Sequence, residues 1–203
     1  MFDIYIITSP DGALPEPEFA REVIKGGAGV IQYREKRKEI ALQTAEKLRQ
    51  VTEEKGVLLI INDWVDIAKE VNADGVHLGQ GDMSISNARK ILGKDKIIGK
   101  STHTLEQAIE AEKEGADYIG VGPIFATKTK PCAPVGLELI KKVKNKVRIP
   151  FVAIGGINEE NIDEVIRAGA KSVAVVSAVA YSKDAAKKVS VLREKLRGNK
   201  NAV

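Results

Sequence analysis

Short apolar segments rich in Val and Ile alternate with longer amphipathic segments along the chain, and this alternation limits the possible folds more than any other feature. Eight short segments are predicted as β-strands: residues 3–8, 30–33, 58–62, 75–78, 97–101, 118–121, 151–154 and 172–176. They are apolar at consecutive positions, which is typical of a parallel sheet covered on both faces. The segments between them have apolar residues three and four positions apart, as Leu105, Ala108 and Ile109 do, and are predicted as helices. Thr104 and Gln107 have the spacing of a capping box at the start of one helix.

Eight strand–helix units within 203 residues predict an α/β fold, a (β/α)₈ TIM barrel formed by a single domain of residues 1–203. The turns GGAGV, NADGV, EGADY and AGAKS form a weak internal repeat, because each one ends a helix and leads into a strand. An open doubly wound sheet is the alternative. It would bind ligand at one switch point, whereas polar residues here follow nearly every strand. The barrel is preferred, and residues from about 198 to 203 are expected to form a flexible tail.

Composition and the first residues exclude several classes of protein. Hydrophobic residues make up 43% of the chain, but the longest apolar run is shorter than the ~18 residues of a membrane span. The beginning, MFDIYIITSPDG, has no basic region and carries Asp3 within its apolar run, unlike a signal peptide. The single cysteine, Cys132, cannot form an internal disulfide, which suits a reducing compartment. We therefore expect a soluble cytoplasmic protein with no membrane partner.

The net charge of +4 does not indicate a nucleic-acid partner. The 32 Lys and Arg residues are interleaved with 28 Asp and Glu residues, as in EAEKEGAD, which is typical of solvated helix surfaces. We expect no nucleic-acid binding, and the sequence leaves the oligomeric state open.

Polar residues and glycines gather where the predicted strands end, and in a TIM barrel these ends form the active-site face. The residues concerned are Gln32, Arg34, Lys36, Asn62, Asp63, His77, Gln80, Asp82, Ser101, His103, Thr127, Lys128, Thr129, Lys130, Gly155, Gly156 and Ser177. A barrel with a purely structural role has no reason to collect Lys, Arg, Asp and Asn on one face. The sequence therefore predicts a site for charged ligands there.

Glycine and other small residues follow the last two predicted strands, in AIGGI and VVSA. Such residues let backbone N–H groups approach an anion, so this pair of strand ends predicts a site for a phosphate group. The alternative is that Gly155 and Gly156 only form a tight turn.

A second predicted subsite contains two carboxylates. Asp63 and Asp82 follow neighbouring strands, so their side chains can converge, and two carboxylates with phosphate oxygens and waters are a usual Mg²⁺ site. Another possible role for Asp63, compatible with the first, is to cap the helix that contains WVDIAKEV.

A third predicted subsite is cationic. Arg34, Lys36 and Lys130 follow two other strands, and cations beside a divalent metal indicate a polyanion such as pyrophosphate. The segment 127–134, which contains Thr and Pro, is expected to form a mobile lid.

The histidines, the cysteine and the tryptophan have less definite predicted roles. His77 is expected to orient the acidic turn that follows it, and His103 either contacts substrate or lies within the Ser101 turn. Cys132 is regarded as incidental because neither histidine is near it in sequence, and Trp64 is expected to pack on the outer helix layer. No Rossmann fingerprint, Walker A motif or zinc-ligand spacing occurs.

An ordered set of motifs resembles the thiamine phosphate synthase family. The motifs QYREK, INDWVDIA, DGVHLGQGD, IGKSTH, DYIGVGPIFATKTK, PFVAIGGI and VAVVSA occur in the family's order, and the resemblance covers essentially the whole chain. Each motif alone is weak, but the ordered set is specific. The resemblance implies a (β/α)₈ barrel that joins hydroxymethylpyrimidine diphosphate to a thiazole phosphate, with Mg²⁺ as cofactor, and yields thiamine phosphate and pyrophosphate.

The resemblance also implies roles for individual residues. The pyrimidine diphosphate would contact Gln32, Arg34, Lys36, Asn62, Ser101 and Lys130, of which Arg34, Lys36, Ser101 and Lys130 are the expected catalytic residues. Mg²⁺ would be held by Asp63 and Asp82, and the thiazole phosphate by Thr127, Thr129, Gly156, Val176 and Ser177. Tyr33, Glu35 and Lys128 lie in the same motifs and are included among the expected substrate-binding residues. Tyr33, where the family commonly has Leu, should nevertheless face away from Gln32 and Arg34 on the strand.

Two other functions stay open at this point. A sister branch of the family contains thiazole tautomerases, isomerases that share the Ser-x-His turn of residues 101–103 but need neither a metal nor a pyrophosphate site. A non-catalytic phosphate-binding barrel with a regulatory role would need only the site after the last two strands. The presence of Asn62, Asp63, Asp82 and Lys130 favours the synthase.

Overall fold

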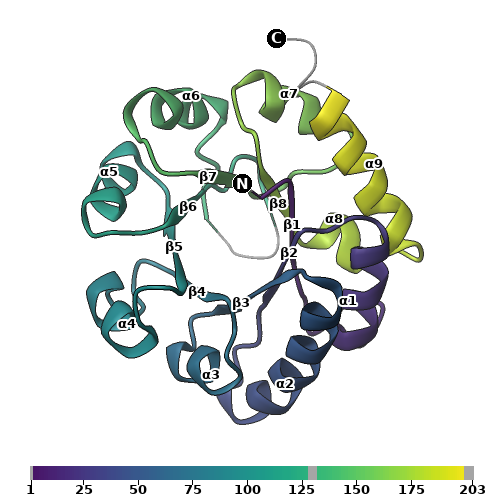
Figure 1. Cartoon of the computed structure of the whole chain (residues 1–203). Helices are drawn as coiled ribbons and strands as arrows, with labels where there is room; N and C mark the ends of the chain where they lie inside the picture. The colour runs from purple at the N-terminus through teal and green to yellow at the C-terminus, as the bar shows by residue number, and fades with distance from the viewer. Residues whose placement is uncertain (1, 128–131, 199–203) are drawn as a thin grey trace.

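The structure, a computed structural model, describes residues 2–127 and 132–198, and in them eight parallel strands close into a barrel (Figure 1). The strands are β1 (Ile4–Ile7), β2 (Val30–Tyr33), β3 (Leu58–Asn62), β4 (Gly75–Leu78), β5 (Ile97–Thr102), β6 (Tyr118–Val121), β7 (Phe151–Ile154) and β8 (Val173–Val175). They pair in chain order, and β1 pairs with both β2 and β8. The predicted (β/α)₈ barrel is confirmed, and the open doubly wound sheet is wrong.

Helices surround the barrel on the outside (Figure 1). They are α1 (Glu16–Lys25), α2 (Lys38–Lys55), α3 (Val65–Glu70), α4 (Ile85–Leu92), α5 (Leu105–Lys113), α6 (Leu137–Lys146), α7 (Ile162–Arg167), α8 (Ser177–Ala180) and α9 (Ala185–Gly198). In the described part of the chain, none of them is long and apolar enough to cross a membrane.

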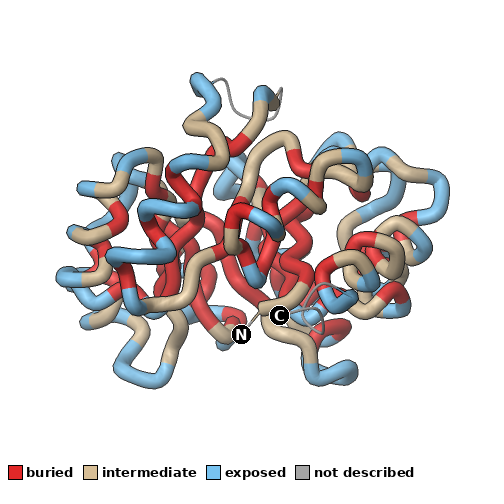
Figure 2. Tube along the Cα trace, turned by 90° about the horizontal axis from the view of Figure 1, so that it is seen from above, coloured by how far each residue is buried: buried red, intermediate tan, exposed pale blue. Residues whose placement is uncertain are grey.

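Each strand sends alternate side chains into two different cores. In β1, Ile4 and Ile6 pack in an outer core with the apolar faces of the helices, whereas Tyr5 and Ile7 pack in an inner core inside the barrel. Figure 2 shows the buried residues as a band through the middle of the molecule, with exposed residues on the outer surfaces of the helices and in loops. Because both faces of the strands are buried, the sequence shows continuous apolar runs in place of an alternating pattern.

Two predictions about helix starts have different outcomes. Thr104 caps α5, since its hydroxyl accepts a hydrogen bond from the N–H of Gln107 at 3.2 Å. The Gln107 side chain accepts from the N–H of His103 at 2.7 Å, so the capping box closes one residue earlier than its usual form. Asp63 does not cap α3: the N-cap position is Trp64, and no side-chain hydrogen bond caps that helix.

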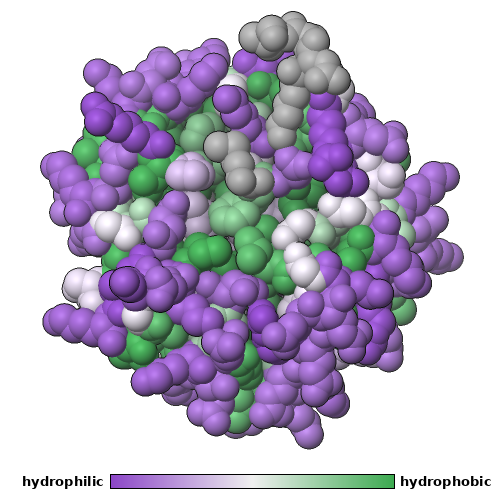
Figure 3. All heavy atoms as spheres, in the orientation of Figure 1, coloured by the Kyte–Doolittle hydropathy of each residue, from purple (hydrophilic) through white to green (hydrophobic). Residues whose placement is uncertain are grey.

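Aromatic rings fill the barrel near the end at which the strands begin. Phe2 lies edge-on to Tyr5 and Tyr118, with ring centroids 5.8 and 5.1 Å away. Gly99 leaves room for Tyr118, because a Cβ at this position would lie 2.2 Å from the phenol ring. Figure 3, in the orientation of Figure 1, shows this end of the molecule with hydrophobic residues at the centre and hydrophilic residues around them. The candidate site lies at the opposite end of the barrel.

Gly99→Ala is expected to lower the free energy of unfolding by about 1–3 kcal/mol or more, because the added methyl group must displace the ring of Tyr118. Gly29→Ala is the matched control, since a Cβ at that position has no other atom within 4 Å. Urea denaturation followed by circular dichroism measures both changes. Equal losses in the two variants would show that the contact with Tyr118 is not what requires glycine at position 99.

Candidate active site

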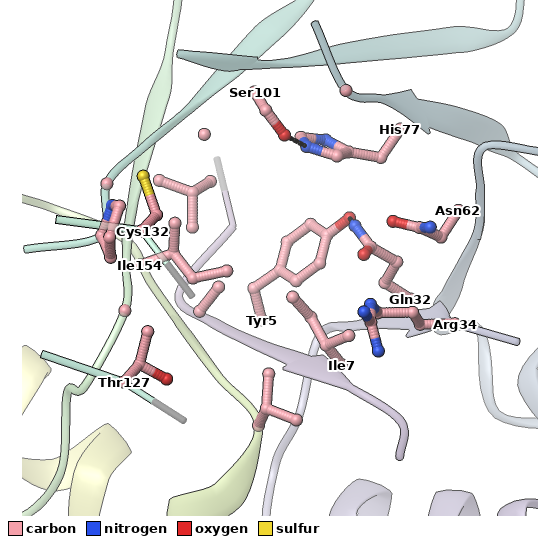
Figure 4. Close-up of a pocket in the computed structure, with 18 of the residues that line it drawn as sticks. Tyr5, Ile7, Gln32, Arg34, Asn62, His77, Ser101, Thr127, Cys132 and Ile154 are labelled. Carbon is pink, nitrogen blue, oxygen red and sulfur yellow. Dashed lines mark hydrogen bonds between the residues drawn. The ribbon is translucent and has the colours of Figure 1, made fainter. Parts of the chain in front are cut away.

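A cavity of about 520 Å³ lies at the end of the barrel where the strands terminate. The predicted site residues that line it are Gln32, Arg34, Lys36, Asn62, Asp63, Asp82, Ser101, Thr127, Gly156, Val176 and Ser177. In Figure 4, Gln32, Arg34 and Asn62 lie on one side of the cavity, Thr127 lies on the other, and Tyr5 lies between them. Closure of the barrel therefore brings together polar residues from segments far apart in sequence.

Two of the expected substrate-binding residues do not line the cavity. Tyr33 packs in the outer core, as its position one residue after Gln32 requires, and burial raises its pKa to about 12. Glu35 is buried beside Arg37, which donates hydrogen bonds to it from its backbone N–H at 2.8 Å and from its guanidinium at 3.0 and 2.8 Å. These bonds lower the pKa of Glu35. The structure thus places both side chains away from the cavity, with Tyr33 in the outer core and Glu35 bonded to Arg37 in the segment after β2.

Three further expected residues, Lys128, Thr129 and Lys130, lie outside the described residues. Their assigned contacts stay predictions, as does the lid formed by residues 127–134.

The carboxyl groups of Asp63 and Asp82 lie within hydrogen-bonding distance of each other, and the Lys36 ammonium contacts Asp63. Burial and the neighbouring Asp82 raise the pKa of Asp63, although Lys36 opposes the rise. Burial also acts to raise the pKa of Asp82, but the hydrogen bond with Asp63, the hydrogen bond from the Gly79 N–H and the positive charges of Lys36 and Lys100 outweigh it, and the pKa is lowered. The pair concentrates negative charge at one point of the cavity wall.

Asp63 reaches this position through an unusual backbone conformation. Its φ is +64°, in the left-handed region that residues other than glycine seldom occupy. Its N–H donates to the carbonyl oxygen of His77 on the adjacent strand at 2.9 Å, which holds the turn in place. Strained backbone of this kind is often found at functional sites.

The turn that carries Asp82 is held from β5. Within the turn, the Gly79 N–H donates to a carboxylate oxygen of Asp82 at 2.6 Å. The ammonium of the buried Lys100 donates to the Gly79 carbonyl at 2.8 Å, and the Gln80 amide donates to the Ser101 carbonyl at 2.6 Å. These bonds fix the Asp82 carboxylate opposite Asp63.

His77 points into the barrel and contacts residues of β5 and β6 through both ring nitrogens, and its role in orienting the acidic turn stays a prediction. Its Nδ1 lies 2.9 Å from the Tyr118 hydroxyl, and its Nε2 lies 2.9 Å from the Ser101 hydroxyl. His103 lines the cavity and bonds through Nδ1 to a backbone carbonyl of the segment after β6. Cys132, regarded as incidental from the sequence, also lines the cavity.

Sequence reasoning missed Tyr5 and Tyr118, whose hydroxyl groups lie at the floor of the cavity. The Gln32 amide nitrogen donates to the Tyr5 hydroxyl at 2.9 Å, and the two tyrosine hydroxyls lie 2.8 Å apart. One signal was available: both tyrosines occupy inward positions of strands whose other inward residues are largely aliphatic or glycine. A buried hydroxyl needs a hydrogen-bond partner, so such a residue points to a polar network inside the barrel.

The end of the cavity formed by β7 and β8 has a backbone suited to an anion. Gly156 has a φ of +67°, and the amide of Asn161 donates to its carbonyl at 2.9 Å. A Cβ on Gly156 would lie 2.6 Å from the carbonyl oxygen of Ala126, so only glycine allows the two segments to approach this closely. Val176 and Ser177 line the cavity beside them, where α8 begins.

The residues present fit a hard cation that is shared with a ligand. In residues 2–127 and 132–198, no group of three or more His, Cys, Asp or Glu side chains is arranged to hold a metal ion. The pair of Asp63 and Asp82 offers carboxylate oxygens, which Mg²⁺ prefers, and Mg²⁺ usually completes its shell with waters and phosphate oxygens. The pair is therefore suited to Mg²⁺ bound together with a phosphorylated ligand.

The chain is similar to known proteins over most of its length. It matches the model of the thiamine monophosphate synthase family over residues 4–179. A thiamine-phosphate synthase of Dictyoglomus thermophilum is 47% identical over an alignment that covers 98% of this chain and 92% of the relative. A thiamine-phosphate synthase of Pelotomaculum thermopropionicum is 49% identical over an alignment that covers 94% of this chain and 90% of the relative. The solved structure of a thiamine phosphate pyrophosphorylase from Pyrococcus furiosus has a TM-score of 0.90 and 42% identity, and covers 97% of this chain and 96% of that one. Because the family match includes β1 to β8, whose ends form the cavity, this chain belongs to the thiamine monophosphate synthase family.

Proposed function

We propose that this protein is a thiamine-phosphate synthase, which joins hydroxymethylpyrimidine diphosphate to a thiazole phosphate and releases pyrophosphate. The observation that carries the proposal is one cavity with an acidic pair, two cations and a glycine-lined anion site. A thiazole tautomerase would need neither the acidic pair nor the cations, and a regulatory phosphate binder would need only the anion site. The named relatives support neither alternative.

The pyrimidine diphosphate is assigned to the side of the cavity formed by β2 to β5. Gln32, Asn62 and Ser101 offer amide and hydroxyl groups for the pyrimidine ring, and Arg34 and Lys36 offer positive charge for the diphosphate. Lys130 is expected to add a further charge from the segment after β6.

The thiazole phosphate is assigned to the other side of the cavity. Its phosphate would bind at Gly156, Val176 and Ser177, with Thr127 nearby and Thr129 as an expected further contact. This arrangement directs the thiazole ring toward the middle of the cavity, where it meets the pyrimidine.

Asp63 and Asp82 are the residues that would hold Mg²⁺. When bound there, the ion would supply positive charge beside the diphosphate and so stabilise it as a leaving group. Lys36, which contacts Asp63, lies close enough to the same place to share this charge stabilisation.

The reaction requires positioning and charge stabilisation, with no protein nucleophile. The bond between the pyrimidinyl methylene carbon and the diphosphate oxygen breaks, and its electron pair leaves with pyrophosphate. The electron-rich aminopyrimidine stabilises the resulting methylene cation, and the thiazole nitrogen attacks it to form the new C–N bond. Arg34 and Lys36 would stabilise the departing charge, while Gln32, Asn62 and Ser101 would orient the ring for attack.

The substrates proposed are small molecules, and no nucleic-acid or membrane partner is proposed. A cytoplasmic location stays a prediction from the sequence, because the single cysteine and the biosynthetic reaction both suit that compartment.

Purified protein mixed with both phosphorylated precursors is expected to form thiamine phosphate and pyrophosphate in equal amounts. Product should require both precursors and Mg²⁺, because the leaving group needs the ion beside the acidic pair. Chromatography of thiamine phosphate and a coupled pyrophosphate assay measure the two products. If no product forms and the thiazole phosphate is isomerised, the tautomerase would be the correct function.

Asp82→Asn is expected to lower kcat/KM by roughly 100-fold or more, because charge stabilisation by a metal contributes several kcal/mol. Calorimetry should also show weaker Mg²⁺ binding in the presence of pyrophosphate. Asp66→Asn is the matched control, because Asp66 pairs with Lys38 at the surface and does not line the cavity. Similar losses of activity in both variants would contradict a specific role for Asp82.

Gly156→Ala is expected to raise KM for the thiazole phosphate roughly 10-fold, the loss expected for one hydrogen bond to a charged group. The added methyl group would push Gly156 away from Ala126 and distort the anion site. Gly115→Ala is the matched control, since Gly115 also has a positive φ but has open space around it. Steady-state kinetics with each substrate varied in turn measures the effect, and an unchanged KM in Gly156→Ala would refute the assignment.

A further inference from the structure

Five side chains form a continuous line of hydrogen bonds across the floor of the cavity. The Gln32 amide nitrogen lies 2.9 Å from the Tyr5 hydroxyl, which lies 2.8 Å from the Tyr118 hydroxyl. His77 continues the line, with Nδ1 2.9 Å from Tyr118 and Nε2 2.9 Å from the Ser101 hydroxyl. Figure 4 shows the two ends, where Gln32 meets Tyr5 and where Ser101 meets His77. We call this line of five residues the relay.

The relay has a direction, because each hydroxyl carries only one hydrogen. The Gln32 amide donates to Tyr5, so the Tyr5 hydrogen is used toward Tyr118 and the Tyr118 hydrogen toward Nδ1 of His77. While the Gln32 amide nitrogen faces Tyr5, any other arrangement would leave a buried hydroxyl hydrogen without an acceptor, at a cost of about 1–3 kcal/mol. Neutral His77 therefore carries its hydrogen on Nε2 and donates it to Ser101. The hydrogen of Ser101 itself is then directed to the cavity.

The surrounding structure keeps the relay in this form. Burial raises the pKa of Tyr5 and of Tyr118 far above neutral, so both phenols keep their hydrogens. Glycines make room for the rings: a Cβ on Gly99 would lie 2.2 Å from the Tyr118 ring, and one on Gly120 would lie 3.3 Å from Cε1 of His77. The packing of β5 and β6 thus leaves space that the relay occupies.

We propose that Tyr5, Tyr118 and His77 are positioning residues that make Gln32 and Ser101 present opposite hydrogen-bonding groups to the pyrimidine. The inference rests on the proposed function and extends it to residues that do not carry the reaction. In the direction described, Gln32 offers its carbonyl oxygen as an acceptor and Ser101 offers its hydroxyl as a donor.

An aminopyrimidine is complementary to this pair of groups, because it has an amino group that donates and ring nitrogens that accept. Reversal of the relay would make Gln32 a donor and Ser101 an acceptor at the same time. Gln32 and Ser101 therefore cannot both be donors to the ligand while the buried hydrogen bonds are kept. The relay therefore selects the orientation of the ring, which determines where the methylene carbon lies relative to the diphosphate.

The first test measures the tautomer of His77 by ¹⁵N NMR of the full-length protein without substrate. The hydrogen is expected on Nε2 in the unchanged protein, and Tyr118→Phe is expected to give a mixture of tautomers because Nδ1 loses its donor. Tyr33→Phe is the matched control: it removes a buried tyrosine hydroxyl from the outer side of β2 and should leave the tautomer unchanged.

The second test is kinetic. Tyr118→Phe is expected to lower kcat/KM for the pyrimidine diphosphate about 10-fold, the effect of one misdirected hydrogen bond, and to change KM for the thiazole phosphate less than about 2-fold. Tyr33→Phe should leave both values within about 2-fold. His77→Gln, whose amide can take the place of Nε2 and donate to Ser101, should retain more activity than the shorter His77→Asn.

Several results would overturn the relay: a hydrogen on Nδ1 in the unchanged protein, an unaltered tautomer in Tyr118→Phe, or equal kinetic losses in Tyr118→Phe and Tyr33→Phe. Equal activities of His77→Gln and His77→Asn would also contradict it. The tautomer is measured without substrate, so it decides the direction of the relay even if the protein has no synthase activity. Failure of the proposed function is recognised separately, by the absence of thiamine phosphate from the unchanged protein.

Discussion

The closed ring of parallel strands is the constraint on which the rest of this structure depends. Pairing of Ile4 with Val173 and of Ile6 with Val175 joins the first strand to the last, so the sheet has no free edge. Because the strands are parallel, they all terminate at one end, and the residues that follow them share one cavity. Gln32 near the start of the chain and Ser177 near its end line the same cavity for this reason alone.

Charge is organised around that cavity in a way that suits a polyanion with a metal. The carboxyl groups of Asp63 and Asp82 lie together, and their opposite pKa shifts follow from burial and from the bonds between them. Lys36 contacts Asp63, and Arg34 lines the same cavity, so an anion and a cation can both be bound without leaving an unpaired buried charge. Bonds from Lys100 and Gln80 fix the turn of Asp82 before any ligand binds, which lowers the cost of ordering the site.

The polar relay lies inside the barrel without destabilising the fold, because its members form hydrogen bonds with one another. Among the described residues, the buried side-chain polar atoms without a hydrogen-bond partner are Ser172 Oγ and Arg193 Nε, and neither belongs to the relay. A fully paired network is rigid, whereas a partly paired one would cost more than an apolar core. The glycines at positions 99 and 120 provide the space for it.

The sequence by itself determined the positions of the strands, the barrel and the family, because apolar periodicity and ordered motifs are local features. It also indicated most residues of the cavity, since they directly follow predicted strands. It did not indicate that Glu35 supports the backbone, that His77 faces Tyr118 and Ser101, or that Asp63 does not cap a helix. These depend on which side chains meet across the barrel. Only the tertiary structure decides them, because hydrogen-bond partners from different strands are brought together only when the ring closes.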